Sequence, residues 1–252
     1  MKDWRHRALS VMAVALTACA GCAQQTGRQG MYEEDTIATS AGPLKIAFIG
    51  HATLMFTFGD RIIHVDPVSR EADYGKMPKG DVILVTHEHS DHLDPEAIAL
   101  VRKEKTTVLL PAKCAPAVPG ATAMKNGDVL TVQGLKIEAV PAYNIVHKRP
   151  SGEPFHPRGE GNGYVITFGD KRVYVTGDTE NIPEMKELKD IAVAFLPMNL
   201  PYTMTPEMVA DAAKAFRPRI LYPYHYGQTD TSELMRLLAG EKGIEVRIRR
   251  MP

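Results

Sequence analysis

The chain has 252 residues, of which 44% are apolar, and its formal net charge is zero. A chain of this length and apolar content can form one large hydrophobic core or two small ones. Its basic residues do not gather into a stripe, so we expect no nucleic-acid partner. Beyond its first residues the sequence has no apolar run long enough to span a membrane.

The first 18 residues have the pattern of a secretory signal peptide. Lys2, Arg5 and Arg7 give a basic start, and the apolar stretch 8–18 is too short for a membrane-spanning helix. It ends in Leu-Thr-Ala-Cys at 16–19, which resembles the bacterial lipobox. We therefore expect lipidation of Cys19 and a protein anchored by lipid to a membrane of the bacterial cell envelope. The alternative is an ordinary signal peptide with an incidental cysteine.

Residues 19–42 are rich in small and polar side chains, a composition typical of a flexible linker. We interpret this segment as a lipidated tether. From 43 to 252 the sequence alternates short apolar runs with turn residues, which predicts one folded domain. Cys114 stands alone in this domain, so we expect a small buried side chain and no disulfide there.

Within the domain, ten short runs rich in valine, isoleucine and phenylalanine predict strands. They cover 44–49, 53–58, 61–65, 82–86, 107–110, 136–140, 164–168, 172–176, 193–196 and 220–222. Three helices are expected to begin at Pro95, Pro206 and Thr231, because a capping side chain and an early acid mark each start. The mixture of strands and capped helices predicts an α/β fold.

An internal repeat divides the domain into two similar halves. Thr-Phe-Gly-Asp at 57–60 recurs at 167–170, Pro-Glu at 95–96 recurs at 206–207, and the apolar-proline run 109–111 has a loose counterpart at 221–223. The order and the nearly constant offset favour duplication over chance. Two such halves suggest two sheets face to face with helices outside, although other layered α/β architectures share this pattern.

A cluster of histidines and acids follows the apolar strand at 82–86. It comprises His87, His89, Asp91 and His92 in the pattern His-x-His-x-Asp-His. A buried strand fixes groups at its end rigidly while they still face a cleft. Imidazole nitrogen and carboxylate oxygen suit Zn²⁺, Mn²⁺ or Fe²⁺, so the cluster predicts a metal site. The alternative, a solvent-exposed histidine-rich turn, explains this position after a strand less well.

This pattern resembles the signature of the metallo-β-lactamase superfamily, over about 44–252. Short motifs at 50–53, 66–67, 177–179 and 223–227 add a similarity to the branch that contains N-acyl-phosphatidylethanolamine phospholipase D and the L-ascorbate 6-phosphate lactonase. The resemblance implies an αββα four-layer sandwich with two pseudo-symmetric halves. It also implies that His87 and His89 bind a first metal, that Asp91, His92 and His225 bind a second, and that Asp178 bridges both.

The third ligand of the first metal is less clear, because the chain lacks the Pro-Gly-His-Thr-like stretch that usually supplies it. His147 and His156 both lie in the long loop before the strand at 164–168. We favour His156 because it directly precedes that strand, as the family's ligand does. Asp66 is the counterpart of Asp178 in the first half, and we expect it to hold a histidine or backbone group. His51 and His64 are expected to pack or to form hydrogen bonds.

The resemblance implies a metal-dependent hydrolase with two divalent ions, expected to be Zn²⁺, with Mn²⁺ or Fe²⁺ as alternatives. A hydroxide on the metals would attack an ester or phosphodiester bond, and Asp91 would orient it or take its proton. A membrane-tethered site favours a small-molecule or lipid-like substrate, which Tyr143, Asn144, Tyr202 or Tyr224 could contact. The alternatives are opening of a lactone or β-lactam ring, and an envelope protein that binds metal without turnover.

Overall fold

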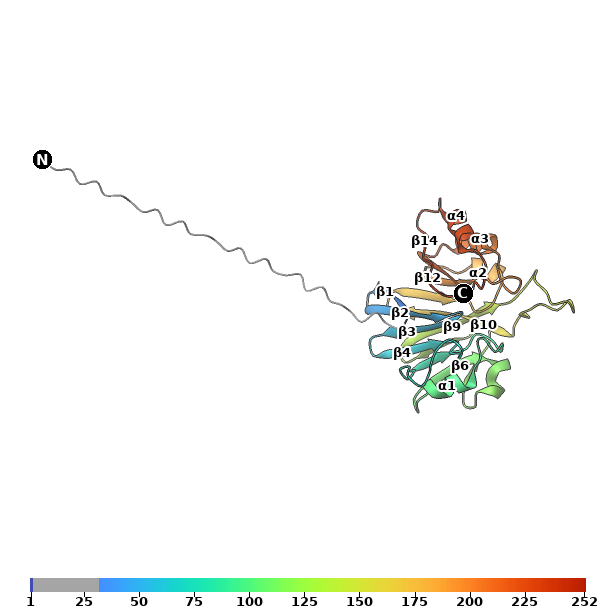
Figure 1. Cartoon of the computed structure of the whole chain (residues 1–252). Coiled ribbons are helices and arrows are strands. Elements are labelled where there is room, and N and C mark those ends of the chain that lie inside the picture. The colour runs from blue at the N-terminus through green and yellow to red at the C-terminus, as the bar shows by residue number, and fades with distance from the viewer. Residues whose placement is uncertain (2–31) are drawn as a thin grey trace.

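The computed structural model describes Met1 and residues 32–252 (Figure 1). The expected signal peptide, the lipobox cysteine Cys19 and most of the expected tether lie outside the described residues. Within the described part of the chain, no helix is both long and apolar enough to cross a membrane.

Two seven-stranded mixed sheets form the centre of the described domain. The first has the strand order β1-β2-β3-β4-β5-β6-β7 and the second has the order β14-β13-β12-β11-β10-β9-β8. The first sheet consists of β1 (Glu33–Thr39), β2 (Gly42–Gly50), β3 (Thr53–Phe58), β4 (Arg61–Val65), β5 (Val82–Leu84), β6 (Thr107–Pro111) and β7 (Thr122–Met124). The second consists of β8 (Val129–Val132), β9 (Leu135–Ala142), β10 (Gly161–Phe168), β11 (Lys171–Val175), β12 (Ile191–Pro197), β13 (Ile220–Tyr224) and β14 (Glu245–Val246).

The two sheets repeat one connectivity, as the internal repeat predicts. In each sheet the first four strands pair antiparallel and the last four pair parallel. The repeated Thr-Phe-Gly-Asp forms the β3–β4 turn in one half and the β10–β11 turn in the other. Gly59 and Gly169 both adopt positive φ there, 62° and 58°, a conformation that glycine reaches without steric cost. The expected pseudo-symmetry is therefore confirmed.

Helices cover the outer face of each sheet and complete four layers (Figure 1). The helices are α1 (Pro95–Val101), α2 (Pro183–Lys186), α3 (Pro206–Phe216) and α4 (Thr231–Leu238), with a 3-10 turn η1 (Ala112–Ala117). Asp94, Thr205 and Asp230 cap α1, α3 and α4 by accepting backbone N–H groups. All three predicted helix starts are confirmed, and α1 and α3 are equivalent elements of the two halves.

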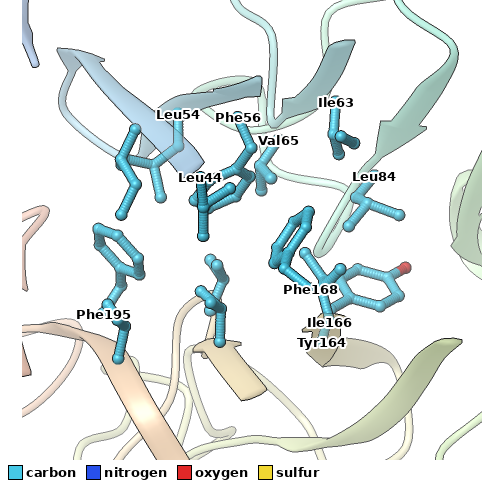
Figure 2. Packing of buried hydrophobic residues seen from close by; sticks show 14 of the residues in the cluster. Leu44, Leu54, Phe56, Ile63, Val65, Leu84, Tyr164, Ile166, Phe168 and Phe195 are labelled. Carbon is cyan, nitrogen blue, oxygen red and sulfur yellow. The ribbon is translucent and has the colours of Figure 1, made fainter. Parts of the chain in front are cut away.

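The main core lies between the sheets, where the two inner faces meet (Figure 2). Leu54 and Phe56 from the first sheet point toward Phe168 and Phe195 from the second (Figure 2). These four side chains are fully buried, and each contributes roughly 1.5–3 kcal/mol by leaving water. Cys114 is buried in a smaller cluster under α1, as expected.

The folded domain begins earlier than the boundary expected at residue 43. Strand β1 occupies the second half of the expected tether and pairs antiparallel with β2 along its whole length. Asp35 in this strand accepts hydrogen bonds from Arg249 at 2.7 Å, which ties the edge strand to the far end of the domain. β1 is an exposed edge strand with few buried side chains, so its polar sequence resembles a linker. The tether prediction is therefore wrong for Glu33–Thr39.

Candidate metal centre

The predicted ligands meet at one edge of the paired sheets, where several strands end. His87, His89, Asp91 and His92 follow β5, Asp178 follows β11, and His225 follows β13. These strands belong to the parallel parts of the two sheets. Their carboxyl ends meet, since His87 Nε2 after β5 lies 3.9 Å from Asp178 Oδ2 after β11. Functional groups of α/β proteins gather at such edges because strand ends hold them rigidly.

A first group of possible metal ligands is formed by His87, His89 and His156, whose ring nitrogens lie within 4.8 Å of one another. His87 Nε2 lies 3.1 Å from His89 Nδ1. His156 comes from the β9–β10 loop, and its Nε2 lies 3.2 Å from Asp178 Oδ2. The structure thus places the favoured candidate among the histidines of the first predicted site.

A second group is formed by Asp91, His92 and His225, together with His51. His225 Nε2 lies 3.5 Å from Asp91 Oδ2 and 3.6 Å from Asp178 Oδ2. His92 Nε2 lies 3.5 Å from Asp178 Oδ1. Asp178 therefore stands between the two groups, with one oxygen toward His92 and the other toward His156 and His225. This is the position that a bridging carboxylate requires.

The buried atoms of this cluster fit a bound cation. Among the described residues, five atoms of the candidate ligands are buried and have no hydrogen-bond partner. One is His225 Nδ1, and the other four face one another: His92 Nε2, His156 Nε2, His225 Nε2 and Asp178 Oδ1. A buried polar atom without a partner costs about 1–3 kcal/mol, so four at one point call for an explanation. Three imidazole nitrogens and a carboxylate oxygen are a donor set that Zn²⁺, Mn²⁺ or Fe²⁺ prefers. The residues present therefore fit divalent transition metals.

Hydrogen bonds on the far side of two histidines place a proton on Nδ1, so the neutral form of each ring has its lone pair on the nitrogen that faces the site. His92 donates from Nδ1 to Asp66 Oδ2 at 2.8 Å. His156 donates from Nδ1 to Asn144 Oδ1 at 2.5 Å. A neutral imidazole with its proton on Nδ1 has a lone pair on Nε2, which is the form that binds metal. The expected role of Asp66, holding a histidine, is confirmed.

The orientation of Asn144 is fixed by a buried carboxylate, Glu180. Asn144 Nδ2 donates to Glu180 Oε1 at 3.0 Å and to the backbone oxygen of Tyr202 at 2.9 Å, so its oxygen must face His156. Glu180 also accepts the backbone N–H groups of Ile145, Val146 and His147 at 2.6–2.7 Å. One carboxylate thus anchors the start of the β9–β10 loop and, through Asn144, the ring of His156.

Close packing brings the two halves together at the site. Gly177, directly before Asp178, has φ of 64°, and a Cβ atom there would lie 2.7 Å from Thr86 Cβ. Only glycine fits this approach, because both the conformation and the space exclude a side chain. Thr86 directly precedes His87, so the contact sets the position of the second-half acid against the first-half histidines.

Burial and charge set the ionisation of the cluster. Burial alone would raise the pKa of Asp178, but His225, His92 and His156 hold that pKa well below its usual range, so the carboxylate is ionised. Burial lowers the pKa of His87 well below its usual value, which keeps the imidazole neutral. Burial also acts to lower the pKa of His92, but Asp178, Asp66 and Asp91 outweigh it and raise the pKa to about 9. A cation at His92 Nε2 therefore displaces a proton at neutral pH.

Three other histidines of the domain lie as follows. His147 Nδ1 lies 2.8 Å from Glu180 Oε1, outside both ligand groups. His64 is buried, and its Nε2 lies 2.9 Å from the backbone oxygen of Pro78. His51 forms hydrogen bonds, as expected, but one of them reaches Asp91 Oδ2 at 3.2 Å. Its part in the site was not predicted, because a single histidine in a Gly-His turn carries no spacing signal.

A cleft of about 410 Å³ opens over the cluster. Besides the candidate ligands it is lined by Ser90, Arg149, Phe155, Asn199 and Tyr202. Of the four expected substrate contacts, only Tyr202 lines this cleft and is exposed. Tyr224 is buried in the core, Tyr143 donates its hydroxyl to Glu184, and Asn144 is buried beneath the loop, so core packing or a structural hydrogen bond explains these three.

Comparison with known proteins gives one consistent family. Residues 45–225 match the family model described as a beta-lactamase superfamily domain. A UPF0173 metal-dependent hydrolase of Methanoculleus marisnigri is 32% identical over 192 residues, which cover 73% of this chain and 81% of that protein. One from Pelotomaculum thermopropionicum is 28% identical over 221 residues, covering 81% of this chain and 96% of the relative.

Two solved structures extend the comparison. A protein of Parabacteroides distasonis described as a metal-dependent hydrolase is 50% identical, with a TM-score of 0.83, and the match covers 88% of this chain and 100% of that one. Igni18, a metallo hydrolase from Ignicoccus hospitalis, is 25% identical with a TM-score of 0.66, covering 81% and 94%. The chain is thus a metal-dependent hydrolase that belongs to the metallo-β-lactamase superfamily and, within it, to the UPF0173 family.

Proposed function

We propose that the protein hydrolyses an ester or phosphodiester bond in a small-molecule or lipid-like substrate, with two divalent ions held by both ligand groups. The observation that carries this proposal is the place of Asp178 between the groups, 3.2 Å from His156 Nε2 and 3.5 Å from His92 Nε2. His87, His89 and His156 would hold one ion, Asp91, His92 and His225 the other, and Asp178 both.

Two ions so held would activate a water molecule and would stabilise the negative oxygen that develops at the carbon or phosphorus under attack. Asp91 is the chain's own group for orienting that water or taking its proton. Burial acts to raise the pKa of Asp91, but His225, His51 and His92 keep it far below its usual range. The carboxylate is therefore ionised and able to accept a hydrogen bond. Phe155 and Tyr202 would form the apolar wall for the substrate.

The proposal also places the protein at the cell envelope, held by lipid at Cys19. The lipobox-like residues 16–19 and the basic start of the chain support this location. A membrane-tethered hydrolase meets lipid-derived and cell-wall-derived molecules, which supports a lipid-like substrate.

The test is turnover and metal content of the purified chain after loading with Zn²⁺ or Mn²⁺. We expect about two ions per chain and chelator-sensitive hydrolysis of bis-p-nitrophenyl phosphate or of p-nitrophenyl esters. Asp178→Asn should lower kcat at least about 100-fold, because it weakens both ligand groups. Asp60→Asn is the matched control, since Asp60 lies in the exposed β3–β4 turn and its side chain is 96% exposed.

Three outcomes would contradict the proposal. Turnover that survives complete removal of metal would exclude the metal-dependent mechanism. Hydrolysis only of a lactone or of nitrocefin would replace the ester or phosphodiester by a ring-opening reaction. Two bound ions with no turnover on any of these substrates would favour a metal-binding envelope protein without catalysis.

A further inference from the structure

Arg149 is a cation at the candidate active cleft without an acidic partner. It lies in the β9–β10 loop, and among the described residues no carboxylate oxygen lies within 4 Å of its guanidinium nitrogens. Two other cations of this region are paired with acids. Arg158 in the same loop pairs with Glu184 at 2.6 Å, and Lys113 in the adjoining depression pairs with Glu88 and Glu160. An unpaired cation at the mouth of a cleft attracts anions.

The groups next to Arg149 leave a place for a further hydrogen-bond acceptor. Its Nη2 lies 3.2 Å from His89 Nε2 and 3.2 Å from the backbone oxygen of Phe155. His89 Nδ1 faces His87 Nε2, so this is the nitrogen that would bind metal. A neutral His89 bound in this way carries its proton on Nε2 and cannot accept from Arg149. Two donors then face each other, and an oxyanion beside them would accept from both.

An apolar rim lies beside this cation. The rings of Phe155 and Tyr202 meet edge to face with centroids 5.0 Å apart, and the guanidinium carbon of Arg149 lies 5.3 Å from the Phe155 centroid. Tyr202 and its neighbour Leu200 are exposed to 45% and 42%. Asn144, which donates to the backbone oxygen of Tyr202, directly precedes two further exposed apolar residues, Ile145 and Val146 at 48% and 61%. Exposed apolar groups clustered at a cleft indicate a binding surface.

We propose that Arg149 selects the substrate, and that the substrate is an amphipathic anion. Its negative group contacts Arg149 and His89 Nε2–H, and its apolar part lies on Phe155 and Tyr202. The contact with His89 rests on the proposed function, because it requires metal at His89 Nδ1. The negative group is either the phosphodiester under attack or a carboxylate or phosphate elsewhere on the molecule. Both sources present the same oxyanion to Arg149.

The kinetic test compares substrates that differ in charge. Mono-p-nitrophenyl suberate has a remote carboxylate, p-nitrophenyl octanoate is its neutral counterpart, and bis-p-nitrophenyl phosphate carries its charge at the scissile group. We expect Arg149→Ala to lower kcat/KM about 10–100-fold for at least one anionic substrate, mainly through KM, and less than about 3-fold for the octanoate. Arg149→Lys should fall between, because lysine keeps the charge without the planar fork. Arg158→Ala is the matched control.

The binding test does not depend on turnover. Calorimetry measures octyl phosphate, octyl glucoside and inorganic phosphate on the Zn²⁺-loaded chain. We expect octyl phosphate to bind tightest and to lose about 10-fold or more in affinity in Arg149→Ala. If no substrate is hydrolysed but this loss is found, the proposed hydrolysis fails and the inference that Arg149 binds an amphipathic anion stands. Equal losses on charged and neutral substrates, unchanged octyl phosphate binding in Arg149→Ala, or inorganic phosphate binding as tightly as octyl phosphate would each overturn it.

Discussion

Replacing Asp66 by asparagine should weaken the second metal site through a residue that touches no metal. Asp66 is fully buried, and its carboxylate accepts three hydrogen bonds: from Thr86 N and Thr86 Oγ1 at 2.7 Å, and from His92 Nδ1 at 2.8 Å. Asparagine keeps one oxygen for Thr86 N but places an N–H₂ group where the other oxygen was. That group donates to His92 Nδ1, so the imidazole proton moves to Nε2, the nitrogen that faces the site.

The size of the effect follows from the bond that is lost. Metal binding at Nε2 of the variant forces the proton back to Nδ1, where it meets an N–H₂ donor in place of a carboxylate. A hydrogen bond to a charged group is worth about 1.5–3 kcal/mol, which corresponds to about 10–100-fold in metal affinity. Folding should suffer less in Asp66→Asn, because the amide can satisfy Thr86 and His92. Asp66→Ala leaves three buried donors unpaired and should cost more than about 3 kcal/mol of stability.

The assay is a competitive chelator titration that resolves two ions, combined with denaturant unfolding. The affinity is measured above about pH 9, where His92 is neutral, because the substitution also removes a carboxylate that favours its protonated form. Asp60→Asn is again the control. In Asp66→Asn we expect the affinity for one ion to fall and the affinity for the other to stay unchanged. Equal affinity for both ions in wild type and variant would refute the tautomer argument, and equal weakening of both would point to a general distortion.

Two further predictions address the third histidine and the anchor. His156→Ala should lose most of the metal that is bound with His87 and His89. His147→Ala should retain its metal, because His147 contacts Glu180. If metal analysis of the two variants gives the reverse order, the ligand is His147. Cys19→Ser should release the protein from membranes in cell fractionation, and a wild-type protein found soluble and unacylated would exclude the lipid anchor.

The strands that the sequence predicts are those buried in the two sheets. Each of the ten apolar runs overlaps a strand of the structure, because a buried strand requires valine, isoleucine or phenylalanine in succession. The strands that were missed, β1, β7, β8 and β14, are the four edge strands of the two sheets. Edge strands expose much of their surface, so their sequence need not be apolar, as the polar β1 shows. The short β8 was missed although its residues, Val-Leu-Thr-Val, favour a strand.

Local spacing marks part of the site, and the family resemblance supplies His156 and His225. The pattern His-x-His-x-Asp-His marks the four candidate ligands within 87–92. The repeat marks Asp66 and Asp178 as equivalent positions. The β9–β10 loop has no periodicity, so its contacts depend on tertiary structure. Asn144 was expected to contact the substrate, but it orients His156. Arg149, which lines the cleft, has no feature in the sequence that distinguishes it from other loop residues. Their roles follow from Glu180 and His89, which meet them only in the folded chain.

The duplicated halves contribute unequal parts to one centre. Asp66 and Asp178 occupy equivalent places after β4 and β11, yet Asp66 points at Thr86 and His92 while Asp178 points into the ligand cluster. The first half thus supplies the histidine cluster and its support, and the second supplies the shared acid and His225. Neither half alone supplies a complete ligand group. Metal binding must therefore stabilise the packing of one half on the other, because ions that bind only the assembled site favour the folded state by mass action.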